Sequence, residues 1–341
     1  MTAPTLRRRR SWTYVLALIC AALALFVVAC GDDDDEPAAG GSSTTEAAAE
    51  ATSDEPITIK MGVVPAETFA PIFVAENEGI WKKHNITVDA KVGGIANTLF
   101  PQLLKGQLDV VASAWGSLAS AREQKLPLTG FAPIDINGST LEDDYQQLVA
   151  PKGGVKDIKE LEGKTIAVPA LKSLTDSQVR VTLRKAGVDD SKVKFLQIPF
   201  PEMPAALKAG RVDAAAVVEP FLTSLKAQGA NVLSATSQGV PMGAMIAAEK
   251  WVKENPDKVK RFQTAWKEAL QFSIDNPDAV RKALSAFQIP EEAAQKVMLP
   301  NFTTELDPAE VQKVADLMKE AGALSQDVDM TKAITPFEPA S

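Results

Sequence analysis

The sequence predicts an α/β protein with two similar domains, each a mixed, mostly parallel sheet flanked by helices. The part from 57 to 341 has 285 residues, which on length alone favours about two domains. Segments typical of strands and of helices alternate along most of this part, as they do in βαβ units. The pattern Leu-x-x-Gly-x-aliphatic-Asp also occurs twice, at 103–109 and 207–213, each time before a run of small apolar residues. We therefore expect equivalent helix-glycine-strand units in the two domains.

The residue patterns also predict the individual elements. In the first half we expect helices at 70–79 and 95–106 and strands at 57–64, 86–92 and 108–112. In the second half we expect helices at 177–187 and 202–210 and strands at 164–170, 193–200 and 212–219. Gly106, Gly187 and Gly210 end three of these helices, because glycine adopts the positive φ of that position without strain.

After residue 240 the chain is predicted to be helical to about residue 321. Within 255–287 the apolar residues recur at helical spacing, namely Val259, Phe262, Trp266, Ala269 and Leu270. Such an amphipathic helix needs an apolar surface to pack on. We expect the first domain to supply it, so that the chain crosses to the second domain and returns.

The first 29 residues have the form of a signal peptide. Four arginines, Arg7 to Arg10, precede an uncharged apolar run from Val15 to Ala29. Cys30 follows directly and resembles the cysteine of bacterial lipoproteins, which becomes the lipidated new N-terminus. We expect an exported protein that is lipid-anchored through Cys30 to the outer face of the cytoplasmic membrane. The alternative is an uncleaved signal anchor, because the apolar run is almost long enough to span a bilayer.

Residues 30–56 are predicted to form a disordered acidic, Ser- and Ala-rich linker. The segment 31–56 contains no aromatic and no large aliphatic residue, so it cannot bury a core. A flexible linker of this length has a root-mean-square span of about 28 Å, which lets the folded part move over the membrane.

Charge and cysteine content restrict the function further. The formal net charge is −8, and removal of 1–29 with its four arginines makes it −12. An acidic chain is a poor candidate for binding nucleic acid, which relies on clustered Lys and Arg. Cys20 leaves with the signal peptide, so the mature chain keeps one cysteine and forms no internal disulfide. His84 is the one histidine, and no G-x-S-x-G motif or metal-ligand spacing is present, so we expect no enzyme, no metal and no cofactor.

Several segments together resemble the solute-binding proteins of ABC importers, specifically the nitrate/sulfonate/taurine and thiamine-pyrimidine group (SsuA/THI5-like). They are "IKMGVVP", "FAPIFVAENEGIWKKHNITVDAKVGG", "LLKGQLDVVASAW", "LEGKTIAVPALKSLT" and "MPAALKAGRVDAAAVVEPF", in order from residue 59. The resemblance implies a two-lobed periplasmic-binding-protein type II fold, with a ligand held between lobes that close on it. In this sequence, lobe I would comprise 57–149 plus 241–341 and lobe II 150–240, with crossovers near 150–153 and 237–240.

The resemblance also implies the partners. We expect a small-molecule solute (sulfonate- or taurine-like, nitrate-like or a nitrogen heterocycle), an ABC permease in the membrane, and a monomer that binds no nucleic acid. One alternative is a pyrimidine synthase on the same fold, although such enzymes rely on a reactive His and a Cys-rich segment that are absent here. Another is a sensory binding protein that signals to a membrane kinase.

Ligands of open parallel sheets lie beyond the carboxyl ends of the strands, so we take the candidate site from the loops there. Several of these loops also precede helix N-termini, whose free N–H groups bind oxyanions. The candidate ligand-binding residues are Glu67, Thr68, Phe69, Gly94, Asn97, Ser113, Trp115, Ser117, Ser173, Thr175, Asp176 and Glu219. Thr68, Asn97, Ser117 and either Ser173 or Thr175 are candidate N-caps, with Pro220 at a first helical position.

Two properties of this set bear on the ligand. Trp115 ends a strand of small residues and either stacks on a planar ligand or belongs to the core. The loops contain more acidic than basic side chains, with Lys172 as the one base. That balance disfavours a simple small anion and leaves an amine, a zwitterion or a neutral heterocycle open. Phe69 and Glu219 have alternative roles in lobe packing and at the hinge.

Overall fold

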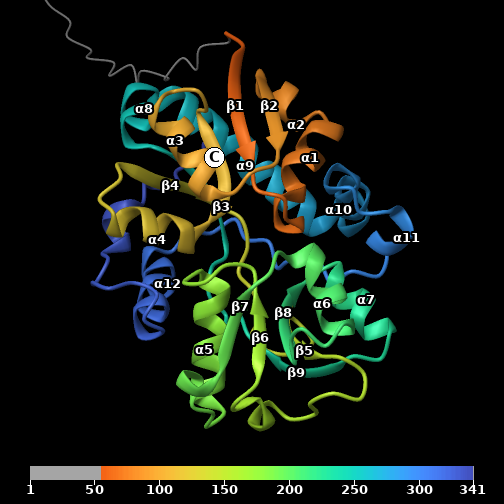
Figure 1. Cartoon of the computed structure of the whole chain (residues 1–341). Coiled ribbons are helices and arrows are strands. Elements are labelled where there is room, and N and C mark those ends of the chain that lie inside the picture. Colours follow the sequence, from red (N-terminus) through yellow and green to blue (C-terminus); the bar gives the residue numbers. More distant parts are fainter. Residues whose placement is uncertain (1–54, 341) are drawn as a thin grey trace, which may run out of the picture. The chain divides into compact units, whose positions relative to one another are not determined.

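The computed structural model describes residues 55–340, which contain two five-stranded sheets with helices around them (Figure 1). The predicted signal peptide, Cys30 and nearly all of the predicted linker lie outside the described residues. Between residues 55 and 340, no helix has the length and hydrophobicity needed to cross a membrane.

The first sheet has the strand order β2-β1-β3-β10-β4. Four of its strands run in one direction, and β10 is antiparallel to both of its neighbours. The strands are β1 (Ile57–Val63), β2 (Ile86–Val92), β3 (Val110–Ala114), β4 (Leu128–Pro133) and β10 (Gly243–Ala248). The first part of the chain adds the helices α1 (Ala70–Asn77), α2 (Ile80–Lys83), α3 (Ala96–Leu104) and α4 (Trp115–Glu123), with a short 3-10 turn η1 (Glu67–Phe69).

The second sheet repeats this order as β7-β6-β8-β5-β9, with β5 as the antiparallel strand. Its strands are β5 (Gln146–Ala150), β6 (Thr165–Val168), β7 (Lys194–Gln197), β8 (Ala214–Val218) and β9 (Asn231–Ala235). Its helices are α5 (Leu174–Lys185), α6 (Met203–Lys208) and α7 (Phe221–Ala227). The prediction of a mixed, mostly parallel sheet in each half is therefore confirmed.

The two copies of the repeated sequence pattern occupy the same place in the two sheets. The carboxylate of Asp109 accepts a hydrogen bond of 2.8 Å from the backbone N–H of Lys60, and Asp213 accepts one of 2.8 Å from Thr165. Each Asp thus links the start of the strand that follows the helix to the adjacent strand. Asp109 links β3 to β1, and Asp213 links β8 to β6. Gly106, at φ +69°, follows the end of α3 as predicted.

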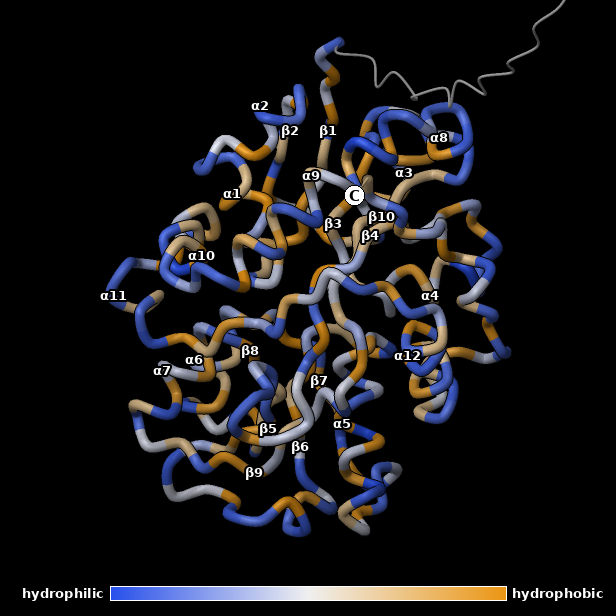
Figure 2. The backbone as a smooth tube through the Cα atoms, turned by 180° about the vertical axis from the view of Figure 1, so that it is seen from behind, coloured by the Kyte–Doolittle hydropathy of each residue, from blue (hydrophilic) through white to orange (hydrophobic). Residues whose placement is uncertain are grey.

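The C-terminal part returns to the first sheet. Its helices are α8 (Glu249–Glu254), α9 (Pro256–Asp275), α10 (Pro277–Ala283), α11 (Glu291–Ala294) and α12 (Pro308–Glu320). The apolar side of α9 is buried as predicted, and the indole N–H of Trp266 donates to the carbonyl of Pro133 at 2.7 Å. Helix α12 also contacts α5 of the second half, where Arg184 donates to the carbonyl of Glu320 at 2.7 Å. Hydrophobic positions recur along the strands, whereas α8 is mostly hydrophilic (Figure 2).

The chain crosses between the sheets twice, and the first crossing differs from the prediction. It lies between β4 and β5, at 134–145, and not near 150–153, because β5 pairs with β8 and β9 of the second sheet. The second crossing lies between β9 and β10, at 236–242, and includes the expected segment 237–240. In each sheet the antiparallel strand is the first strand after a crossing. The sequence analysis missed β4, β5, β9 and β10.

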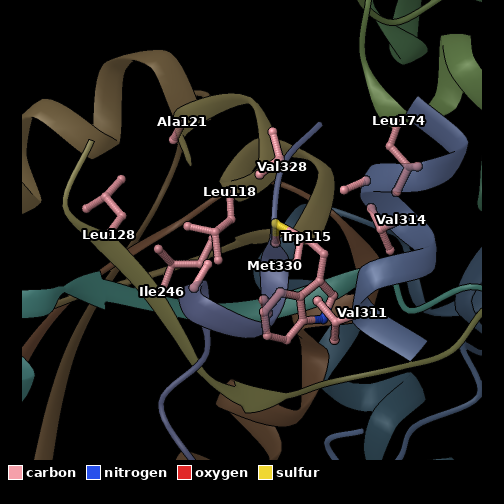
Figure 3. Packing of buried hydrophobic residues seen from close by; sticks show 14 of the residues in the cluster. Trp115, Leu118, Ala121, Leu128, Leu174, Ile246, Val311, Val314, Val328 and Met330 are labelled. Atoms are coloured by element: carbon pink, nitrogen blue, oxygen red, sulfur yellow. The ribbon is translucent and has the colours of Figure 1, made fainter. Parts of the chain in front are cut away.

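Trp115 is a core residue, which is the second of the two roles that the sequence left open for it. It is the first residue of α4, and its side chain is 1% exposed. The indole packs in a hydrophobic cluster made by α4, β10, α12 and the C-terminal segment, as Figure 3 shows. Labelled members include Leu118, Leu128, Ile246, Val311 and Met330.

The same cluster explains Gly130, which lies in β4 directly against the indole of Trp115. A Cβ atom added at this position would overlap the six-membered ring of the indole. We predict that Gly130→Ala lowers the free energy of unfolding by about 1–3 kcal/mol, because an overpacked core forces side chains out of their preferred rotamers. Chemical denaturation measures the loss. Trp115→Phe removes the overlapping atoms, so the double variant should lose less than the sum of the two single variants; strictly additive losses would contradict this packing.

Candidate ligand site at the carboxyl ends of the strands

A buried polar network joins the two crossings. The carboxylate of Asp144 accepts hydrogen bonds from the backbone N–H of Gln146, Thr236 and Ser237 and from the hydroxyl of Ser237, all at 2.7–2.9 Å. The amide of Gln146 then donates to Gln178 of α5 at 2.8 Å and to Thr236 at 2.9 Å. Burial raises the pKa of Asp144, and these hydrogen bonds oppose that effect. The network therefore holds the crossings and α5 in one arrangement.

Asp135 lies near the start of the first crossing, two residues beyond the end of β4. Its carboxylate accepts 2.8 Å hydrogen bonds from the hydroxyl of Tyr145 and from the backbone N–H of Gly243. The side chain is 1% exposed, and burial raises the pKa of Asp135. A third chain segment runs alongside, since Asp135 also pairs with Phe302 in an isolated bridge and Ile136 N–H donates to Asn301 at 3.0 Å.

Glu67 is the least satisfied acidic group of this region. It lies in η1, beyond the carboxyl end of β1, and is 4% exposed. Within the described residues its carboxyl has no ion pair and no side-chain hydrogen bond; its own backbone N–H is the one donor. Burial, reinforced by the negative charges of Glu219 and Asp135, raises the pKa of Glu67 to about 8. The group therefore carries a proton at neutral pH.

Thr68 follows Glu67 and is likewise buried without a side-chain hydrogen bond. It is 6% exposed, and its hydroxyl lies beside the carboxyl of Asp135 but outside hydrogen-bond geometry. Among the described residues, Asn137 Oδ1 and Gln147 Oε1 are further buried side-chain atoms without a hydrogen-bond partner. Buried polar atoms in folded proteins almost always have a partner, so these three atoms near the crossings are exceptions.

Glu219 reaches the same region from the second sheet, directly beyond β8. Its carboxylate accepts hydrogen bonds from the backbone and hydroxyl of Thr223, at 3.0 and 2.9 Å, and from the backbone N–H of Met298 at 3.2 Å. Burial raises the pKa of Glu219. Because Met298 follows α11, this bond joins the second sheet to the C-terminal part, in agreement with the lobe-contact role considered for Glu219.

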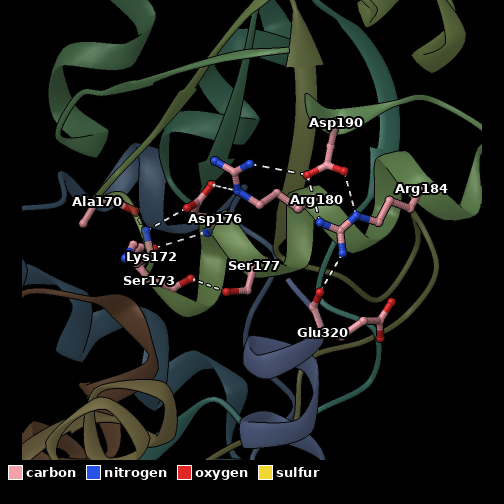
Figure 4. A network of polar contacts seen from close by, with 9 residues as sticks. All are labelled: Ala170, Lys172, Ser173, Asp176, Ser177, Arg180, Arg184, Asp190 and Glu320. Carbon is pink, nitrogen blue, oxygen red and sulfur yellow. Dashed lines mark hydrogen bonds and ion pairs between the residues drawn. The ribbon is translucent and has the colours of Figure 1, made fainter. Parts of the chain in front are cut away.

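The predicted residues on α5 are bound within their own helix and sheet, as Figure 4 shows for the N-terminal turn. Ser173 is the N-cap, and its hydroxyl accepts from the backbone N–H of Asp176 at 3.2 Å. Asp176 pairs with Arg180 at 2.9 Å and accepts from the backbone N–H of Lys172 at 2.7 Å. Thr175 donates from its hydroxyl to Gln146 at 2.8 Å. Asp176 is therefore neutralised locally, whereas Thr175 belongs to the polar network.

The other predicted residues do not join this network. Phe69, like Trp115, is buried in a hydrophobic core cluster. Gly94 and Asn97 are exposed before and in α3, Ser113 is buried within β3, and Ser117 is half-buried in α4. The predicted caps Thr68, Asn97 and Ser117 do not cap helices, because α1, α3 and α4 follow Phe69, Ile95 and Ala114. Pro220 is the N-cap of α7 and does not occupy its first helical position.

The sequence analysis missed Asp135, Asp144, Tyr145, Gln146 and Gln178. A signal was present for the first of them, because Asp135 follows an apolar run, 128–134, in the way that Glu219 follows β8. The adjacent glutamines Gln146 and Gln147 before an apolar stretch were a second signal, since buried amides in a strand need partners.

Other parts of the described chain offer less chemistry. His84 lies beside Glu268, with 2.8 Å between Nε2 and Oε2, and Lys83 pairs with the same carboxylate at 2.7 Å. In residues 55–340 no three His, Cys, Asp or Glu side chains are placed to hold a metal ion. A cavity of about 260 Å³ beside α4, lined by residues such as Arg122 and Asp329, includes none of the predicted site residues.

Comparison with known proteins defines the class. The model of the NMT1-like family matches residues 52–287, so the chain belongs to the NMT1-like family. It is 29% identical over 211 residues to a binding protein of Brucella abortus (strain 2308), a match that covers 60% of this chain and 63% of that relative. The fold is that of periplasmic solute-binding proteins, which confirms the resemblance seen in the sequence.

Two solved structures illustrate the likeness in fold. The alkanesulfonate-binding protein SsuA from Xanthomonas axonopodis pv. citri, bound to MOPS, has a TM-score of 0.69 at 17% identity, covering 83% of this chain and 99% of that one. The periplasmic nitrate-binding protein NrtA from Synechocystis PCC 6803 has a TM-score of 0.66 at 18% identity, covering 82% and 85%.

The raised pKa of Glu67 predicts how stability depends on pH. The ordinary Glu value is 4.5 and the folded value is about 8, so between these pH values the folded state holds a proton that the unfolded state lacks. The contribution of Glu67 to the free energy of unfolding is fully present below pH 4.5 and is lost as pH rises through about 8. Glu67→Gln cannot ionise, so the variant should lose less stability than the wild type between pH 5.5 and 8.5, by on the order of a few kcal/mol.

Thermal unfolding at the two pH values measures this difference. Glu76→Gln, an exposed position in α1, is the matched control and should follow the wild type. Equal pH dependence in Glu67→Gln and the wild type would show that Glu67 is ionised without penalty.

Proposed function

We propose that the chain is an extracytoplasmic solute-binding lipoprotein of an ABC importer, which captures a small organic solute between two closing lobes and delivers it to a permease. In this proposal lobe I contains the first sheet with the C-terminal helices, and lobe II contains the second sheet. The crossings and the segment around Asn301 form the hinge. Binding free energy that favours the closed over the open arrangement would drive closure.

One observation carries the proposal: buried acidic side chains lie beyond the carboxyl ends of strands of both sheets, and Glu67 among them accepts no side-chain hydrogen bond within the described residues. Glu67 and Asp135 follow β1 and β4 of the first sheet, and Glu219 follows β8 of the second. The negative charges of Glu219 and Asp135 raise the pKa of Glu67. This is the position at which ligands bind in open α/β sheets.

The names of similar proteins support the class and leave the solute open. SsuA is described as an alkanesulfonate-binding protein and NrtA as a nitrate-binding protein. For this chain the solute class is a sulfonate- or taurine-like compound, a nitrate-like anion or a nitrogen heterocycle. The chain acts as a monomer without enzymatic activity in this proposal.

The decisive measurement is identification of a solute that stabilises the protein. A solute at 100 times its Kd should raise the free energy of unfolding by about 2.7 kcal/mol, because it binds the folded state alone. Mass spectrometry of natively purified protein should detect the bound compound, and thermal shift with that compound should reproduce the gain. Chemical conversion of the recovered compound during incubation would favour the enzyme instead.

Anchoring through Cys30 is a separate part of the proposal. Cys30→Ser removes the thiol that would carry the lipid. The variant should therefore move from the membrane fraction to the soluble fraction, because a folded part without a lipid has little affinity for the bilayer. Fractionation of cells with immunoblotting measures the distribution. Cys20→Ser is the matched control and should remain membrane-bound; retention of Cys30→Ser would instead support an uncleaved signal anchor.

A further inference from the structure

We propose that the solute carries a protonated nitrogen, as in a primary amine or an amidine, which binds against the carboxyl of Glu67. This inference rests on the proposed function and specifies the solute class. It selects one of the chemistries that the loop composition left open, and it differs from the anions named for the solved relatives.

Three buried carboxyls, those of Glu67, Asp135 and Glu219, lie beyond the carboxyl ends of strands of the two sheets. Asp135 and Glu219 are each held by hydrogen bonds from their own surroundings, including the backbone N–H groups of Gly243 and Met298. Glu67 has no comparable donor among the described residues. A carboxyl buried to this extent requires a donor, and a cationic N–H group supplies one together with the opposite charge.

The hydroxyl of Thr68, adjacent in sequence to Glu67, is buried without a partner and faces the carboxyl of Asp135. It can accept a second N–H of the same ligand group. An amine or amidine has several N–H groups, so one head group can satisfy both residues.

Within residues 55–340, no Lys or Arg forms an ion pair with Glu67, Asp135 or Glu219. Lys172, the base expected in the loops, acts on Glu123 of α4. Lys226 of α7 is exposed and acts on Glu219 from its own lobe. An anionic solute would therefore meet a field of its own sign.

Ionisation couples this site to closure and to pH. The negative charges of Glu219, from the second sheet, and Asp135, from the first, act on Glu67, and Tyr145 donates a hydrogen bond to Asp135. Bringing these carboxyls together is unfavourable unless a proton or a cation neutralises them. At pH 7 the proton is on Glu67, so a bound cation should displace it to solvent. Affinity should then rise about tenfold per pH unit up to about pH 8, for a ligand that stays protonated.

The inference is tested with matched probes that share a frame and differ in head group. The set contains benzamidine, benzamide and benzenesulfonate, and butylamine, butyramide and butanesulfonate, each tested by thermal shift on the purified full chain. We expect stabilisation by at least one cation and none by its amide or sulfonate partner. Isothermal titration of that cation, in buffers of different ionisation enthalpy, should show release of close to one proton at pH 7.

Variants assign the effect to Glu67. Glu67→Gln should weaken the cation about 10- to 100-fold and abolish proton release, whereas Glu76→Gln should keep both. Stabilisation by a sulfonate or amide probe, or a co-purified anionic solute, would overturn the inference and leave the proposed function standing. If no probe stabilises the chain and no small molecule co-purifies, solute binding itself fails and the inference fails with it. Unchanged cation affinity in Glu67→Gln would overturn the role of Glu67 alone.

Discussion

The junction of the two sheets depends on two buried carboxylates that fix the chain where it crosses between them. Asp135 lies near the start of the first crossing and holds the backbone N–H of Gly243. Asp144 lies near its end and holds the backbone N–H groups of Thr236 and Ser237. A buried donor without an acceptor costs about 1–3 kcal/mol, so these two residues make the second crossing possible at this depth. The antiparallel strand of each sheet starts from this fixed point.

The same junction contains acidic groups of a different kind. Asp135 and Asp144 stabilise neighbouring backbone donors, which offsets part of the free energy lost when a charge is buried. Glu67 is equally buried but accepts no hydrogen bond from a neighbouring residue. Its pKa is raised because burial is not offset in this way. A structure tolerates such a group where another interaction requires it. The hydroxyl of Thr68 beside it is a second buried polar group without a hydrogen-bond partner.

Much of the fold could be predicted because its signals are local. The repeated pattern placed a helix, a glycine and a strand in each half, and Asp109 and Asp213 make equivalent bonds in both sheets. The antiparallel strands escaped prediction for a physical reason. The run "GAMIAA" of β10 is as compatible with a buried helix as with a strand, and its pairing partners β3 and β4 are more than a hundred residues away. The position of the first crossing depended on the same non-local pairing.

The site was less predictable, because position after a strand does not determine what a side chain meets. Trp115 and Glu67 both follow strand ends, yet the indole turns into the core against Gly130, and the carboxyl stays among other acids. An aromatic ring is stabilised by burial in any apolar surrounding, so its presence at a strand end carries little information about a ligand. A buried acid without donors is unstable by itself, so it carries much more. An acidic loop residue that lacks hydrogen-bond donors, such as Glu67, is therefore a better guide to the solute than the aromatic residue Trp115.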